Sequence, residues 1–112
     1  MSYTTTIEHV FGSAMVVPGW GFLLNNELTD FDAEPKDALG KPKANALAPE
    51  KRPRSSMTPV LVFRDGRPLL AVGSPGGSLI IPTVQEVVTN WVDFKMPLKE
   101  ALAQSRFAGR GG

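Results

Sequence analysis

Two consecutive glycines stand where this chain is best placed to bind a negative charge. Gly76 and Gly77 belong to the segment GSPGGS, between an apolar run and a stretch of helical periodicity. A turn that leads from a strand into a helix aims unpaired backbone N–H groups outward, and glycine permits close approach. Two such N–H groups can stabilise a tetrahedral oxyanion. The alternative is a tight connection that uses glycine for geometry alone; no lysine follows, so this is not a Walker phosphate loop.

Acidic residues form a second candidate site, in the segment NNELTDF. Glu27 and Asp30 are three residues apart, so one helical turn would place both carboxylates on one side. Such a pair can bind an ammonium group, or it can be a pair of solvated surface charges. Glu8 precedes His9, but neighbours on a strand point to opposite faces. The sequence therefore predicts that His9 is structural and does not act together with Glu8.

Paired serines form a third candidate site, in the segment RPRSSMTP. Ser55 and Ser56 could donate two hydroxyl groups to a carboxylate. The alternative is turn formation and strand capping, which serine and proline commonly provide.

Strands are expected to hold these residues in place. Runs rich in β-branched and apolar residues predict strands over 3–7 and 21–26. Residues 58–63 and 67–72 flank Arg64-Asp65-Gly66, and Asp-Gly between apolar runs predicts a hairpin. By contrast, residues 32–54 hold four prolines and many charges without apolar periodicity, which predicts a long surface loop, either mobile or acting as a lid.

Helices are predicted for the C-terminal third of the chain. Residues 80–94 carry an apolar stripe at helical spacing, formed by Val84, Val87, Val88, Trp91 and Val92. Met96-Pro97 ends this helix, and a second short helix is expected over 98–104. Strands followed by helices indicate an α+β fold, a largely antiparallel sheet with two C-terminal helices on one face.

Composition excludes several classes of function. The chain has 112 residues, 42% of them hydrophobic and 21% charged, which is typical of one small globular domain. A formal charge of +1 gives no reason to expect nucleic acid or an anionic membrane as a partner. There is no cysteine and only one histidine, so neither a thiolate metal site nor clustered imidazole ligands are expected. No signal peptide or membrane span is recognisable, and a cytoplasmic or a periplasmic location is equally compatible.

The order of these motifs resembles one known family. TTTIEHVFG, GFLLNNELTDF, a Pro/Ala-rich loop, KRPRSSMTP and VGSPGGS follow one another as in the small subunit of γ-glutamyltranspeptidases. The resemblance covers residues 4–106. It implies part of an N-terminal-nucleophile hydrolase sandwich, acting on γ-glutamyl amides such as glutathione through an acyl-enzyme, with no metal or organic cofactor.

The resemblance also implies roles for individual residues. Glu27 and Asp30 match the pair that holds the α-ammonium of the γ-glutamyl group. Ser55 and Ser56 match the serines that bind its α-carboxylate, helped by an arginine of the large subunit. Gly76 and Gly77 match the oxyanion-hole glycines, and residues 32–51 cover the lid region of many members.

Two departures from the family pattern are visible. Glu8 stands where the family usually has asparagine, which would add negative charge beside the substrate and can alter substrate preference. The family's nucleophilic threonine is expected on a strand that precedes residues 4–7. The resemblance therefore implies that Thr4, Thr5, Thr6 and Ser2 are not the nucleophile, and that this chain alone is inactive.

The expected partners are a γ-glutamyl substrate and the remainder of a parent enzyme, namely its large subunit and nucleophile strand. Two alternatives remain open. One is a non-catalytic fragment or interaction module, which could self-associate as a homo-oligomer through open sheet edges. The other is an acylase-like relative of the same fold, for which Glu8 is the only indication.

Overall fold

The computed structural model describes residues 1–109 and contains two compact units. Met1–Thr4 and Ser56–Gly112 form the hairpin–helix unit, and Thr5–Ser55 form the loop unit. Within the described residues, no helix is long and apolar enough to cross a membrane. Because the two units are separate bodies, the fold of each is considered by itself.

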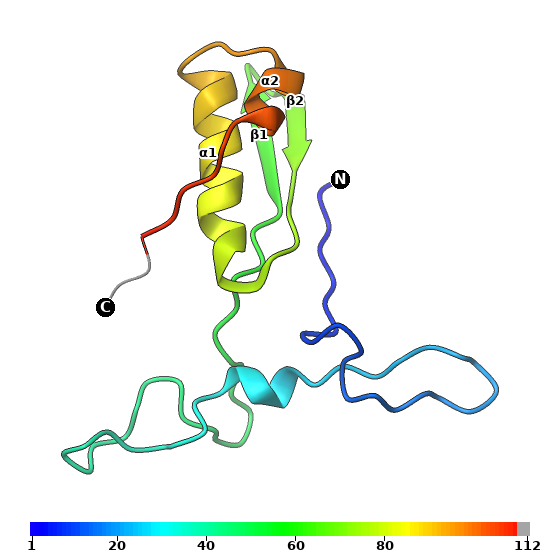
Figure 1. Ribbon diagram of the computed structural model, residues 1–112, viewed down its shortest axis with the longest axis vertical. Helices are drawn as coiled ribbons and strands as arrows, with labels where there is room; N and C mark the ends of the chain where they lie inside the picture. The colour runs from blue at the N-terminus through cyan, green and yellow to red at the C-terminus, as the bar shows by residue number, and fades with distance from the viewer. Residues whose placement is uncertain (110–112) are drawn as a thin grey trace. The chain divides into compact units, whose positions relative to one another are not determined.

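The hairpin–helix unit begins with the predicted hairpin. Strand β1 (Val60–Arg64) pairs antiparallel with strand β2 (Arg67–Val72), with Val60 opposite Val72 and Arg64 opposite Arg67 (Figure 1). Asp65 and Gly66 both adopt positive φ, at 50° and 75°. This is the turn geometry that Asp-Gly favours and that matches the twist of paired strands. The register shifts after Val62, so Pro68 lies beside an irregularity, where its missing N–H group interrupts no regular ladder.

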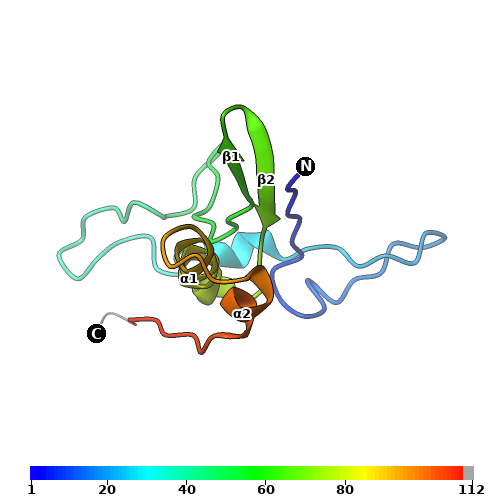
Figure 2. The same cartoon turned by 90° about the horizontal axis from the view of Figure 1, so that it is seen from above.

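Two helices follow the hairpin, close to their predicted bounds. A 3-10 turn (Gly77–Leu79) leads directly into α1 (Ile80–Val92), and α2 (Leu98–Ala103) packs against α1. The view from above in Figure 2 shows α2 beside α1. The α+β order and the antiparallel pairing are confirmed, but the described sheet has only two strands.

The core of this unit is small and lies on the apolar stripe of α1. Ile80, Val84 and Val87 are buried, as is Ala101 of α2, and Val87 is only 1% exposed. Of the stripe predicted from the helical spacing, Val84 and Val87 are buried, whereas Val88, Trp91 and Val92 are only half-buried.

Val87→Ala is expected to lower the free energy of unfolding by about 2 kcal/mol, because it removes two methyl groups from the largest fully buried side chain. Urea unfolding followed by circular dichroism measures this loss. Ile81→Ala on the same helix is the control, since Ile81 is 49% exposed and should cost clearly less. Equal losses at the two positions would contradict this placement of the core.

The loop unit has little regular structure. It contains one 3-10 helix (Glu27–Asp30) and isolated bridges between Val16 and Leu23, Asp32 and Ala46, and Lys36 and Pro42. The strand predictions for residues 3–7 and 21–26 are wrong for this structure. Residues 3–7 are not paired in a ladder, and residues 21–26 contribute only the bridge at Leu23. Extended segments become strands only where a partner strand donates and accepts the backbone hydrogen bonds.

Candidate functional site

Glu27 and Asp30 begin and end a single 3-10 turn of the loop unit. Side chains at i and i+3 eclipse one another in this type of helix, so the two carboxylates lie on one side, as the spacing predicts. The turn is closed by the N–H of Thr29, which donates to the carbonyl of Asn26 at 2.9 Å. Behind it Phe31 is buried at 8% exposure and anchors the turn to the unit.

Glu8 joins the same cluster from a distant part of the sequence. Its carboxylate accepts hydrogen bonds from Thr29 Oγ1 at 3.0 Å and from Asn26 Nδ2. Asn26 also accepts from the backbone N–H of His9 at 3.0 Å. Asn26 therefore fastens the 8–9 turn to the acidic turn.

The expectation that the side chains of Glu8 and His9 point to opposite faces of a strand is wrong. Glu8 has a φ of 69°, which ends the extended run and turns the chain. His9 Nε2 consequently lies 3.3 Å from Glu8 Oε2, and the imidazole is 70% exposed. The alternation rule applies only while the backbone stays extended.

Glu27 is placed unfavourably for a charged carboxylate. It is half-buried, and among the described residues its Oε1 atom is shielded from water and has no hydrogen-bond partner. Burial raises the pKa of Glu27, and the negative charges of Asp30 and Glu8 and a hydrogen bond with Asp30 raise it further. A buried acceptor without a partner costs free energy, so a cationic donor bound here would stabilise the site.

The serine pair lies where one unit ends and the other begins. Ser55 closes the loop unit and is exposed, whereas Ser56 opens the second segment of the hairpin–helix unit and is half-buried. The carbonyl of Ser56 accepts a hydrogen bond from Thr58 Oγ1 at 2.9 Å. Just before the pair, the N–H of Arg54 donates to Asn45 Oδ1 at 2.9 Å.

The glycine turn connects β2 to α1 in the hairpin–helix unit. Gly76 has a φ of 133° and Gly77 a φ of 55°, backbone conformations that residues with a side chain rarely adopt. Both glycines are exposed, and the carbonyl of Gly76 accepts from the N–H of Leu79 at 3.1 Å. Among residues 1–109, no carbonyl outside the helices and strands accepts from the N–H of either glycine.

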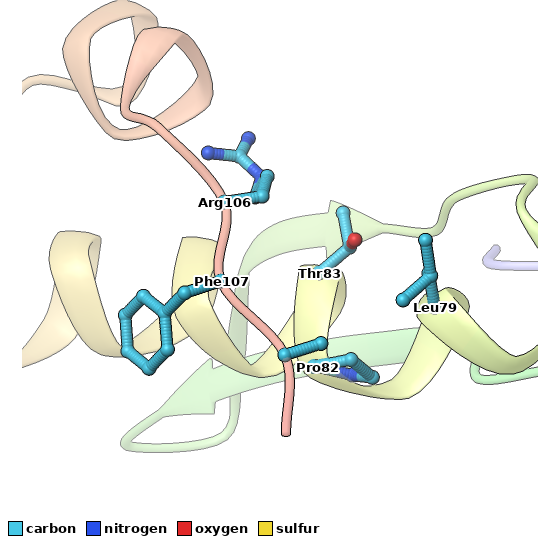
Figure 3. A pocket seen from close by; sticks show the side chains of 6 residues that line it. Leu79, Pro82, Thr83, Arg106 and Phe107 are labelled. Carbon is cyan, nitrogen blue, oxygen red and sulfur yellow. The ribbon is translucent and has the colours of Figure 1, made fainter. Parts of the chain in front are cut away.

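A shallow pocket lies elsewhere in the same unit. It has a volume of about 240 Å³ and lies between the start of α1 and the tail that follows α2; Leu79, Pro82, Thr83, Arg106, Phe107 and Ala108 line it (Figure 3). Arg106 donates to the carbonyls of Leu102 and Gln104, at the end of α2. Its guanidinium thus caps a helix, and the pocket contains none of the residues predicted from the sequence.

Three polar residues that organise the loop unit were not singled out from the sequence. Asn26 and Thr29 bind Glu8, and Asn45 links Asp30 to Arg54. The Asn25-Asn26 pair indicated only a turn, and Asn45 lay inside the segment predicted to be a long surface loop. In the part of the chain that the structure describes, no group of three or more histidine or acidic residues could hold a metal ion.

The chain matches known proteins over nearly its whole length. A family model described as gamma-glutamyltranspeptidase matches residues 1–111. A glutathione hydrolase proenzyme of Bacillus subtilis (strain 168) is 49% identical over 106 residues, which are 95% of this chain and 17% of that protein. An acylase proenzyme of a Pseudomonas species (strain SE83) is 36% identical over 112 residues, all of this chain and 19% of that protein.

Solved structures agree with the sequence matches. A gamma-glutamyltranspeptidase mutant of Helicobacter pylori superimposes with a TM-score of 0.86 and 44% identity, covering 98% of this chain and 61% of that chain. The chain therefore spans less than a fifth of the two curated relatives and about three fifths of this solved chain. On the family match, the identities and the shared N-terminal-nucleophile hydrolase fold, this chain belongs to the γ-glutamyltranspeptidase family.

Proposed function

We propose that this chain supplies γ-glutamyl recognition and oxyanion stabilisation to a γ-glutamyltransferase or glutathione hydrolase. The observation that carries the proposal is the half-buried Glu27, with an unpartnered oxygen and a raised pKa beside Asp30 and Glu8. An α-ammonium group placed there would donate to the unpartnered oxygen and neutralise part of the crowded negative charge. Charge-assisted hydrogen bonds of this kind are the stronger ones in proteins.

The substrate's α-carboxylate requires donors beside it. Ser55 and Ser56 each offer a hydroxyl group, and serine hydroxyls can rotate to suit an acceptor. In the proposed enzyme an arginine of the large subunit adds the opposite charge. An amino-acid head group is then bound at both of its charges, which is what distinguishes a γ-glutamyl group from a simple acyl group.

The glycine turn is proposed to act on the other end of the substrate. When a threonine hydroxyl attacks the γ-amide carbonyl, the carbonyl oxygen becomes an oxyanion, and the N–H groups of Gly76 and Gly77 donate to it. Collapse of this intermediate expels the amine and leaves a γ-glutamyl ester on the threonine. Water then releases glutamate, or an amino-acid amine takes the γ-glutamyl group, and no cofactor is required for either step.

The nucleophile is proposed to come from the parent enzyme and not from the N-terminal hydroxyls of this chain. Ser2 Oγ donates to the carbonyl of Val72 at 3.3 Å, and Thr6 Oγ1 accepts from the N–H of Glu8 at 2.9 Å. Both hydroxyl groups thus have structural hydrogen bonds. A nucleophilic hydroxyl instead needs a base within hydrogen-bonding distance to take its proton.

The purified 112-residue chain is therefore expected to release no p-nitroaniline from γ-glutamyl-p-nitroanilide, because the proposed nucleophile belongs to another part of the parent enzyme. Absorbance at a protein concentration far above that of an active enzyme control measures this, and the complete protein that carries the chain is the positive control. Turnover by the pure chain, lost on Ser2→Ala, would overturn the assignment. Sedimentation of the same sample tests the alternative of a self-associating module.

A further inference from the structure

The side chain of Asn45 joins two parts of the loop unit that lie far apart in sequence. Its Nδ2 donates to the carbonyl of Asp30 at 2.7 Å, and its Oδ1 accepts from the N–H of Arg54 at 2.9 Å. Its own backbone carbonyl accepts from the N–H of Asp32 at 3.1 Å. Three hydrogen bonds therefore hold one half-buried residue between the acidic turn and the serine segment.

Only an amide of this length meets both side-chain contacts. A backbone carbonyl can only accept and a backbone N–H can only donate. The Asp30 contact therefore requires a donor, whereas the Arg54 contact requires an acceptor on the same side chain. Aspartate would place an oxygen against the Asp30 carbonyl, and alanine would leave both groups without these bonds.

The two backbone groups that Asn45 joins belong to, or directly precede, residues of the proposed recognition site. Asp30 is itself part of the carboxylate pair, and Arg54 immediately precedes Ser55. All four residues belong to the loop unit. A parallel bridge between Asp32 and Ala46 supports the same connection.

The remaining contacts across this junction are weaker. Arg54 and Asp32 approach to 3.8 Å, but the arginine side chain is 76% exposed, so water screens the pair. Lys51 Nζ donates to the carbonyls of Ala44 and Ala46, which closes the loop on itself without reaching the acidic turn. The amide of Asn45 is thus the main polar link between Asp30 and Arg54.

We infer that Asn45 is a positioning residue that sets the distance between the ammonium-binding carboxylate of Asp30 and the carboxylate-binding hydroxyl of Ser55. The inference rests on the proposed function of these two residues. When the ligand's α-ammonium is bound, its α-carboxylate is then bound more tightly. The reason is that the two sites are held at a fixed separation, so one ligand can occupy both without reordering the loop. Without the amide, the two ends should bind independently.

Competitive inhibition of the complete protein, with γ-glutamyl-p-nitroanilide as substrate, tests the inference. The inhibitors are L-glutamate, glutarate without the α-ammonium, 4-aminobutanoate without the α-carboxylate, and butyrate without both. In the unaltered protein, the increase in inhibition constant from L-glutamate to butyrate should be smaller than the product of two separate increases. These are the increases from L-glutamate to glutarate and from L-glutamate to 4-aminobutanoate. In Asn45→Ala and Asn45→Asp, L-glutamate should bind about tenfold more weakly, and the two losses should become independent.

Matched variants separate positioning from general damage. Asn90→Asp and Asn90→Ala change the same residue type on α1, outside the proposed site, and should leave all four inhibition constants unchanged. Lys51→Met loosens the same loop but keeps the Asn45 amide, so the dependence between the two ends should persist. Asn45→Asp preserves side-chain size and one acceptor, which keeps the test valid should Asn45→Ala fail to fold.

The possible failures are distinguishable. Glutarate and 4-aminobutanoate binding as tightly as L-glutamate in the unaltered protein would overturn the proposed function itself. The unaltered protein could instead prefer L-glutamate while binding of the ammonium and carboxylate ends stays interdependent in folded Asn45→Asp. That result would overturn only the role of Asn45.

Discussion

Gly76→Ala is expected to lower kcat for γ-glutamyl-p-nitroanilide by about a hundredfold to a thousandfold in the complete protein, the range seen when one oxyanion donor is lost. Gly76 has φ 133° and ψ 20°, a conformation closed to alanine. The backbone must rotate to admit the methyl group, and this rotation turns the adjoining Gly77 N–H away from the oxyanion. Because neither glycine contacts the amino-acid head group in the proposed mode, KM should change little. Steady-state kinetics measure both constants.

Gly66→Ala is the matched control for this variant. Gly66 lies in the hairpin of the same unit with a φ of 75°, and a methyl group added there meets nothing within 4 Å. Its strain should cost about 1 kcal/mol of stability and leave kcat unchanged. A folded Gly76→Ala protein with unaltered kcat would show that the glycine turn has a purely structural role.

Glu27→Gln is expected to raise KM for the γ-glutamyl donor by about tenfold to a hundredfold. The substitution keeps the size of the side chain but replaces a charged acceptor of the ammonium by a neutral one, and charged hydrogen bonds contribute more than neutral ones. It should at the same time make the folded protein more resistant to urea at neutral pH. The reason is that burial, and then the negative charges of Asp30 and Glu8, make the charge of Glu27 costly in the folded protein.

The pH dependence follows from the direction of this shift. The pKa of Glu27 is raised in the folded state, so folding favours the protonated form. The stabilisation is fully present below the ordinary pKa of a glutamate, about 4.3, and is lost as pH rises through the raised value. Glu27→Gln should therefore gain most in stability at neutral pH and little at acidic pH. In the unaltered protein KM is expected to rise at acidic pH as Glu27 becomes protonated, and this rise should be absent from Glu27→Gln.

Glu86→Gln is the control for charge removal, because Glu86 lies on α1 and accepts from the N–H of Phe107, outside the proposed site. It should leave KM unchanged. A Glu27→Gln protein that binds the donor normally while gaining stability would mean that the crowded carboxylate does not hold the ammonium.

Local patterns predicted the hairpin–helix unit well. Asp65-Gly66 predicted the turn, and the spacing of the valines predicted the helix and two of its buried residues, Val84 and Val87. In each case the interacting residues are neighbours in sequence, so periodicity and turn chemistry contain the information.

Contacts that depend on strand partners or on an unusual backbone angle could not be predicted from local sequence patterns. Residues 3–7 have the composition of a strand, but pairing depends on a partner that composition does not specify. The Glu8–His9 contact depends on the positive φ of Glu8, which the sequence TTTIEHV does not predict. Residues 32–54 were predicted only as a long surface loop, mobile or acting as a lid, and the composition did not indicate that Asp37 accepts from the N–H groups of Leu39 and Lys41 and organises a turn within them.

The candidate site shows the same division. The spacing of Glu27 and Asp30 was enough to place them together, because both lie in one turn. Glu8 and Asn45 reach that turn from 21 and 15 residues away, through side-chain bonds to Thr29 and to the Asp30 carbonyl. The roles of Ser55, Ser56, Gly76 and Gly77 rest on the family resemblance together with their chemistry, and they remain predictions.

The most direct test compares γ-glutamyl-p-nitroanilide with glutaryl-p-nitroanilide, which differs only by lacking the α-ammonium group. With the complete protein, the account predicts that kcat/KM for the γ-glutamyl substrate is at least about tenfold higher, and that Glu27→Gln removes most of this preference. Equal use of the two substrates, unaffected by Glu27→Gln, would contradict γ-glutamyl recognition by the acidic turn and would favour an acylase of the same fold.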